Sequence, residues 1–124
     1  MQYKFTIDGR LPGLNEYIAA MNSNRHKGNE MKQQSQELII WHLRHQLRGT
    51  CINKPINIEY CFCEPNMKRD KDNISGFSHK VIQDALVEAR IIANDGWKQI
   101  IGFSDSFAVD KNNPRIEVTL TEVE

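Results

Sequence analysis

Two aspartates separated by one residue, Asp70 and Asp72, are the residues of this sequence whose type and spacing best suit metal chemistry. A third carboxylate, Asp95, follows in an Asn-Asp-Gly turn signal. Magnesium prefers oxygen ligands, and proteins commonly hold it with a few carboxylates while water and substrate phosphate complete its shell. Such an ion neutralises a phosphate and lowers the pKa of an attacking water. We therefore predict that Asp70, Asp72 and Asp95 bind Mg2+, with Mn2+ as an alternative ion, and that the site cuts a phosphodiester in DNA.

Other metal sites fit the sequence less well. By itself an acidic pair is a weak signal, because such pairs are common in solvated loops and at helix starts. A calcium loop is excluded, since its fifth position is Ile74 and its twelfth is Val81, where a glutamate is needed. A zinc site is not indicated either, because Cys61 and Cys63 form a single C-x-C pair with no second pair to complete four ligands.

Four more polar residues accompany the aspartates in the same stretch. Lys80 is the candidate for stabilising charge that develops in the transition state. Asp84 follows it by four residues, so we expect an i,i+4 ion pair in which Asp84 orients the lysine rather than binds the metal. Asn73 and Asn94 stand directly beside two of the acids as supporting residues. Asp72 or Asn73 is also the predicted N-cap of the next helix.

The elements that must position these residues follow from hydrophobic periodicity. Alternating apolar residues predict strands over 3–7, 56–63 and 115–123 and a strand or hairpin arm over 99–109. Helical spacing predicts helices over 14–21, 30–48 and 74–89, with a polar loop over 22–29. The order is β-α-α-β-α-β-β, which favours an α+β (mixed α/β) fold: a single domain over 1–124 with a small mixed sheet of about four strands covered by helices.

Composition sets the cellular setting that we expect. The net charge is zero, yet residues 1–54 hold eight lysines and arginines against four acids, while residues 55–124 hold eight against twelve. The basic half can supply phosphate contacts, unless the asymmetry arises by chance. Three cysteines without a disulfide framework suit a reducing compartment. No apolar run approaches the roughly 20 residues of a membrane span, and residues 1–10 lack a signal-peptide core. We expect a cytoplasmic protein with no membrane contact.

The longer pattern is more specific than the acidic pair. Arg69-Asp70-x-Asp72-Asn73 is followed by Lys80-x-x-x-Asp84-Ala85-Leu86 and then by Asn94-Asp95. This order resembles the RusA family of Holliday-junction resolvases, small crossover junction endodeoxyribonucleases of phages, prophages and bacteria. The similarity extends to the early segment 12–15 and to the later segments 96–100 and 113–118, so it spans nearly the whole chain.

The resemblance implies a function and a set of site residues. It implies a homodimer that binds four-way DNA junctions and nicks two strands symmetrically with Mg2+ during DNA recombination and repair; two-fold symmetry suits paired cuts. The family's catalytic acids fall on Asp70, Asp72 and Asp95, and its essential lysine falls on Lys80. Candidate DNA contacts are Lys68, Arg69, Lys71, Arg44 and Arg48.

Two departures from the family pattern affect the site. The family commonly has its lysine four residues after the second aspartate, where this chain has Gly76. About four extra residues therefore lie within 74–79. If they form a loop, Lys80 starts a helix near the metal; if they add a helical turn of about 5.4 Å, Lys80 is displaced and Lys71 or Lys98 can substitute. In addition, Asn94 replaces the first acid of the family's final pair.

These departures leave two alternative functions open. One is a non-catalytic module that binds branched DNA and keeps the fold without cutting. The other is a nuclease for flaps, replication forks or other branched DNA. A plain protein-interaction domain would not account for an acidic pair, a lysine and a remote acid in this order.

Overall fold

The computed structural model describes residues 1–124 and contains four strands and three helices. In chain order they are β1 (Gln2–Asp8), α1 (Leu14–Ser23), α2 (Arg25–Gln46), β2 (Ile56–Glu64), α3 (Lys71–Glu88), β3 (Ile100–Val109) and β4 (Arg115–Glu122). The predicted α+β class and the order β-α-α-β-α-β-β are confirmed. None of the helices combines the length and the apolar character that a bilayer crossing requires.

The four strands form one mixed sheet in the order β1-β4-β2-β3. Strand β4 pairs antiparallel with both β1 and β2, whereas β2 and β3 are parallel. A parallel pair needs a long crossover connection, and helix α3 supplies it here. Ile56 pairs with Ile100 at the start of these two strands, and Glu64 pairs with Val109 at their end. Strand β3 is an edge strand, so one side of its backbone has no partner within the chain.

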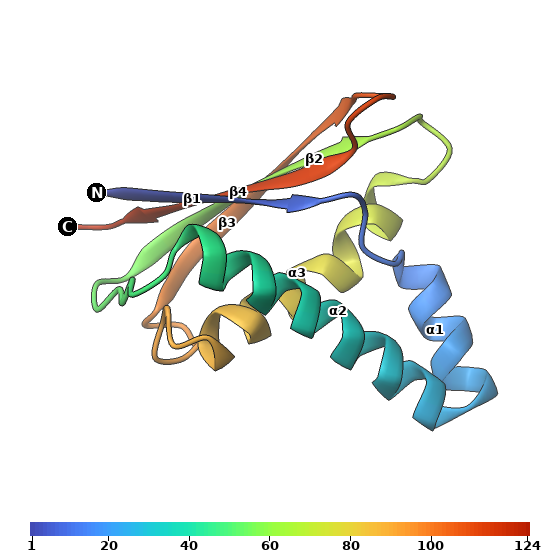
Figure 1. The fold of residues 1–124 in the computed structure, drawn as a ribbon, viewed down its shortest axis with the longest axis horizontal. Coiled ribbons are helices and arrows are strands. Elements are labelled where there is room, and N and C mark those ends of the chain that lie inside the picture. The colour runs from blue at the N-terminus through green and yellow to red at the C-terminus, as the bar shows by residue number, and fades with distance from the viewer.

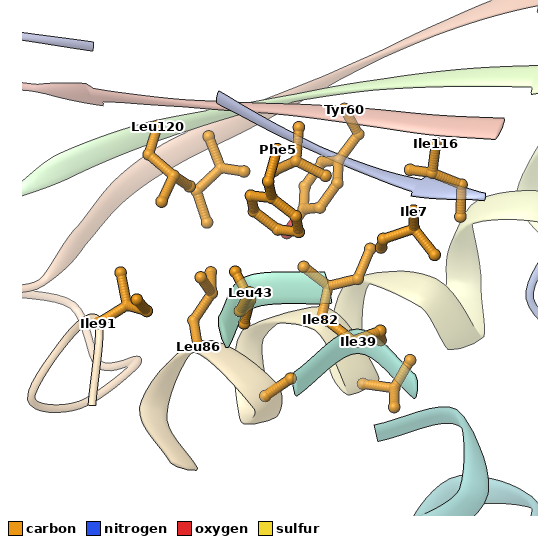
Figure 2. Packing of buried hydrophobic residues seen from close by; sticks show 14 of the residues in the cluster. Phe5, Ile7, Ile39, Leu43, Tyr60, Ile82, Leu86, Ile91, Ile116 and Leu120 are labelled. Atoms are coloured by element: carbon orange, nitrogen blue, oxygen red, sulfur yellow. The ribbon is translucent and has the colours of Figure 1, made fainter. Parts of the chain in front are cut away.

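All three helices lie on one side of the sheet, with α2 and α3 beneath it and α1 beyond one end (Figure 1). The inward-facing residues of the strands alternate as predicted, so that Phe5, Tyr60 and Leu120 meet Leu43 and Leu86 of the helices (Figure 2). These residues belong to a single cluster of 23 buried apolar residues. The cluster anchors α3, and the two ends of α3 carry the residues of interest.

Helix α2 begins five residues earlier than predicted, at Arg25 rather than at residue 30. Asn24 caps it, because its side-chain oxygen accepts a hydrogen bond of 2.9 Å from the backbone N–H of His26. Gly28 is buried where a Cβ atom would overlap the side chain of Met21 in α1. The segment predicted as a polar loop is therefore mostly the first turns of α2, tightly packed on α1.

Candidate active site

The acidic pair lies at an open surface pocket of about 750 Å³ where β2 and β3 end and α3 begins. Asp70, Lys71 and Asp72 line it together with Asn66 and Phe107. The three charged residues are exposed. Carboxylates and a lysine from α3 thus face the same cavity as the aromatic ring of Phe107 from β3.

Helix α3 starts earlier than the predicted cap at Asp72 or Asn73. Its first residue is Lys71, and Asp70 is the N-cap with an extended backbone (φ −67°, ψ 154°). Asp72 is therefore in the first helical turn, where its charge is stabilised by the positive end of the helix dipole. Asp72 accepts a hydrogen bond of 2.9 Å from the N–H of Asn73, whereas no hydrogen bond or ion pair engages the carboxylate of Asp70. Carboxylate oxygens are left available for a hard cation.

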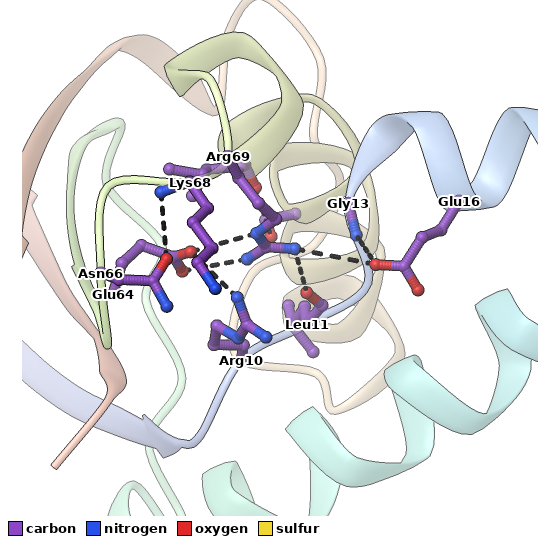
Figure 3. A network of polar contacts seen from close by, with 10 residues as sticks. Arg10, Leu11, Gly13, Glu16, Glu64, Asn66, Lys68 and Arg69 are labelled. Carbon is purple, nitrogen blue, oxygen red and sulfur yellow. Dashed lines mark hydrogen bonds and ion pairs between the residues drawn. The ribbon is translucent and has the colours of Figure 1, made fainter. Parts of the chain in front are cut away.

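The loop that leads to Asp70 is held by Arg69. Its guanidinium donates to Glu64 at the end of β2 through Nε (3.0 Å to Oε1) and Nη2 (2.9 Å to Oε2). Its Nη1 donates to the carbonyl of Leu11, 3.2 Å away (Figure 3). Arg10 adds a longer contact with the same Glu64 carboxylate. Arg69 lines the acidic pocket, and its three nitrogen atoms each donate within the protein, so it positions the neighbouring aspartate. Its predicted contact with DNA stays a prediction.

Asn73 ties the site to helix α1. Its side-chain oxygen accepts a hydrogen bond of 2.8 Å from the backbone N–H of Asn15, in the first turn of α1. A Cβ at Gly13 would lie 2.8 Å from that same oxygen, so only glycine fits there without moving Asn73. The supporting role predicted for Asn73 thus has a structural basis: it caps α1 and fixes the start of α3.

At Gly76, where the family pattern has its lysine, helix α3 packs closely against Leu14 of α1. Gly76 lies in α3, and a Cβ there would be 2.9 Å from Cδ2 of Leu14 in α1. A longer side chain at this position would require the side chain of Leu14 to shift. The chain therefore has a close helix–helix contact where the family pattern has its lysine.

The extra residues before Lys80 are helical, so the displaced alternative is the observed one. Lys80 lies about 12 Å further along the axis of α3 than Asp72 and does not line the pocket. Its Nζ contacts Oδ1 of Asp84 at 3.2 Å, which confirms the predicted i,i+4 pair. Lys32 of α2 contacts Oδ2 of Asp84 at 3.0 Å. Burial alone would raise the pKa of Asp84, but the hydrogen bonds and charges of Lys32 and Lys80 outweigh burial and lower it.

Asp95 lies at the other end of α3 from the acidic pair. The helix has 18 residues and is therefore about 27 Å long. Asp95 follows it, in the connection to the start of β3, where its N–H donates to the side chain of Asn94 at 2.9 Å. Within one chain, Asp95 cannot share an ion with Asp70 and Asp72, contrary to our prediction. Accordingly, no group of three or more His, Cys, Asp or Glu side chains lies in a metal-binding arrangement within the chain.

The remaining candidate cations divide between the two ends of α3. Lys68 and Lys71 are exposed near the acidic pocket, and Lys71 Nζ lies 5.6 Å from the ring centroid of Phe107, within range of a cation–π contact. Lys98 is at the far end, so Lys71 is the substitute lysine that the structure brings to the acidic pair. Sequence reasoning missed Phe107, whose only signal was its place in an apolar alternation.

Arg44 and Arg48 lie far from the acidic pocket. They border a smaller cavity between the ends of α2 and α3, together with Arg90. The sequence did not single out Arg90, because its position beside the other two arginines depends on how the two helices pack.

The comparison with known proteins adds no relative. No protein-family model matches the chain, and no curated protein matches it. Family membership therefore stays a prediction that rests on the residue pattern.

Proposed function

We propose that this protein is a Mg2+-dependent endodeoxyribonuclease that resolves Holliday junctions by paired symmetric nicking in DNA recombination and repair. The observation that carries the proposal is the acidic pocket: Asp70 and Asp72 converge on one open cavity with Lys71 beside them. One or two carboxylates, completed by water and substrate phosphate, are the usual protein contribution to a Mg2+ site. The two exposed aspartates fit that requirement.

In this proposal the bound ion supplies charge neutralisation at the scissile phosphate and an activated water. The chain's own residues do the rest. Asp70 and Asp72 hold the ion, and the ammonium of Lys71 contacts the phosphate and stabilises charge that develops on it. Arg69 and Glu64 keep the loop before Asp70 in place, because their paired hydrogen bonds join it to the end of β2.

Asp95, the third aspartate, can join the acidic pair if a second copy of the chain supplies it, which favours a homodimer. Strand β3 has an unpaired edge, and Ile101, Phe103 and Val109 on it are 55%, 53% and 52% exposed. An exposed apolar edge strand is a ready template for pairing with another chain. Two copies that pair through β3 in antiparallel fashion place the start of one strand opposite the end of the other.

That pairing brings the separated acids together. The start of β3 follows Asp95, and the end of β3, at Val109, lines the acidic pocket. Asp95 of the partner subunit then approaches Asp70 and Asp72, so each of two symmetric sites is built from both chains. Two equivalent sites related by a two-fold axis match a reaction that cuts two strands symmetrically.

The first test is cleavage of a synthetic mobile four-way junction with Mg2+, comparing the wild type with Asp72→Asn and using a linear duplex as the control substrate. We expect paired symmetric nicks in the junction alone, abolished by EDTA and by Asp72→Asn while binding persists. Tight junction binding by the wild type without cleavage would contradict the enzymatic proposal and support a non-catalytic binding module. Equal cleavage of flaps and forks would support the broader nuclease.

A second test addresses the shared site. Asp70→Asn and Asp95→Asn are each expected to be inactive alone. When the two variants are mixed to form heterodimers, one site has both substitutions and the other has neither, provided that the partner supplies Asp95. The mixture should regain single nicks without paired ones. If Asp95 served its own chain, both sites of the heterodimer would be defective and no nicking would return.

A further inference from the structure

We infer that Arg44, Arg48 and Arg90 form a separate binding site for a backbone phosphate of the DNA. The inference rests on the proposed function, because it assigns the ligand as DNA. The site is a cavity of about 350 Å³ between the C-terminal ends of α2 and α3. It lies at the end of α3 opposite the acidic pocket.

The positive charge of this cavity is not neutralised by any acidic residue in its lining. No aspartate or glutamate lines it, and no ion pair or hydrogen bond engages any of the three guanidinium groups. Arg44 lies in the last turn of α2 and Arg48 two residues beyond its end, and both line the cavity with Arg90. A guanidinium presents planar paired donors that match phosphate oxygens. An anion between the three arginines would remove their mutual repulsion and satisfy their donors.

The helix dipole offers a simpler account for two of the arginines but not for the third. Cations near the C-terminus of a helix are stabilised by its negative end, and Arg44 lies in the last turn of α2 with Arg48 just beyond it. Arg90 lies outside α3, and its backbone is left-handed, with φ of 61°. It follows the C-cap Ala89, and the N–H groups of Arg90 and Ile91 donate to the carbonyls of Val87 and Leu86 at 3.0 Å each.

Glycine is the usual residue in this left-handed position, because a Cβ atom is strained there. The chain does use glycine beyond the end of α2, where Gly49 has φ of 77°. At the end of α3 it has an arginine instead and accepts the strain. Strained backbone positions are concentrated at functional sites. The presence of Arg90 at the cavity that Arg44 and Arg48 also line supplies a functional reason for the strained residue.

Cys51 allows the site to be tested without any substitution, because this exposed free thiol lines the same cavity. Cys61 lies on the face of the sheet opposite the helices. Burial and the contact with Cys61 raise the pKa of the Cys63 thiol to about 11. We expect a saturating four-way junction, bound in EDTA to prevent cleavage, to slow alkylation of Cys51 at least tenfold and leave Cys61 unchanged. Unchanged alkylation of Cys51 in the bound complex would overturn the inference.

Arg90→Gly separates binding from folding. Glycine relieves the backbone strain, so the melting temperature should stay the same or rise. Loss of one phosphate contact should weaken junction binding about tenfold. It should also reduce the slope of the logarithm of the binding constant against the logarithm of the salt concentration by about one. Lys4→Ala, an exposed lysine on β1, is the matched control and should leave binding unchanged.

The outcomes distinguish this inference from the proposed function. If the wild type binds and cuts the junction while Arg90→Gly binds it equally well with the same salt dependence, the arginine site is refuted and the nuclease stands. If the wild type binds no DNA, both fail.

Discussion

Arg69 donates two hydrogen bonds to Glu64 in a parallel arrangement, and both side chains are largely buried, with 15% and 7% of their surface exposed. This pair joins the residue before Asp70 to the last residue of β2. A paired geometry of this kind fixes orientation as well as distance. The position of the acidic pair therefore depends on an ion pair whose two residues line the same pocket.

Glu64→Gln should lower the free energy of unfolding by about 3 kcal/mol, because removal of one partner leaves the guanidinium of Arg69 buried without its counter-charge. Urea denaturation followed by circular dichroism measures the change. Glu16→Gln is the matched control, since Glu16 is exposed and lies 3.9 Å from Arg69. A loss for Glu64→Gln no larger than that for Glu16→Gln would show that the buried pair does not stabilise the loop.

Gly13 and Asn73 should be coupled energetically. Asn73→Ala removes the cap on α1 and should cost about 1 kcal/mol. Gly13→Ala should cost a similar amount, because its Cβ would displace the side chain of Asn73. In the double variant the Cβ atom at position 13 no longer meets an asparagine side chain. The loss of unfolding free energy should therefore be smaller than the sum of the two single losses. Additive losses in a double-mutant cycle of unfolding free energies would contradict the contact.

Lys71, rather than Lys80, should be the lysine that the reaction requires. Lys71 lines the acidic pocket, whereas the side chain of Lys80 is 65% exposed and paired with Asp84. Lys71→Ala should reduce the rate of junction cleavage about 100-fold at saturating DNA, and Lys80→Ala should change it little. Single-turnover kinetics measures both. The reverse result would mean that the lysine of the family pattern acts despite its displacement along α3.

Asp84 should make a pH-dependent contribution to stability. Its pKa in the folded protein lies below the usual value of 3.8, so the unfolded chain takes up a proton first as the pH falls. The contribution is therefore complete near neutral pH and is lost as the pH drops below about 4. The difference in unfolding free energy between wild type and Asp84→Asn should be constant near pH 7 and shrink at acidic pH. A difference that grows on acidification would contradict this sign.

The sequence by itself determined the elements and the acidic pair. The alternation of Ile116, Val118 and Leu120 is a local pattern, so it predicted β4 and its buried face before any partner strand was known. Asp70 and Asp72 are two residues apart, and no fold can separate them. The i,i+4 pair of Lys80 and Asp84 followed from spacing for the same reason.

Helix boundaries were predicted less well, because local signals compete with packing. Asp70 occupies the N-cap position of α3, without a capping hydrogen bond from its side chain, although Asp72 and Asn73 are equally suitable residue types. The side chain of Asn73 is instead engaged with α1. Similarly, the early start of α2 depends on Gly28 fitting against Met21. Contacts of this kind join residues of different elements, so they cannot be predicted from the periodicity of the sequence.

Only the tertiary structure decided which charged residues meet. Arg69 is engaged by Glu64 because β2 ends beside the start of α3, and Arg90 joins Arg44 because α2 and α3 end together. Asp95 is separated from Asp70 because α3 runs the length of the parallel β2–β3 pair before the chain turns back. Distances across a fold depend on how whole elements pack, and the spacing of residues in the sequence does not set them.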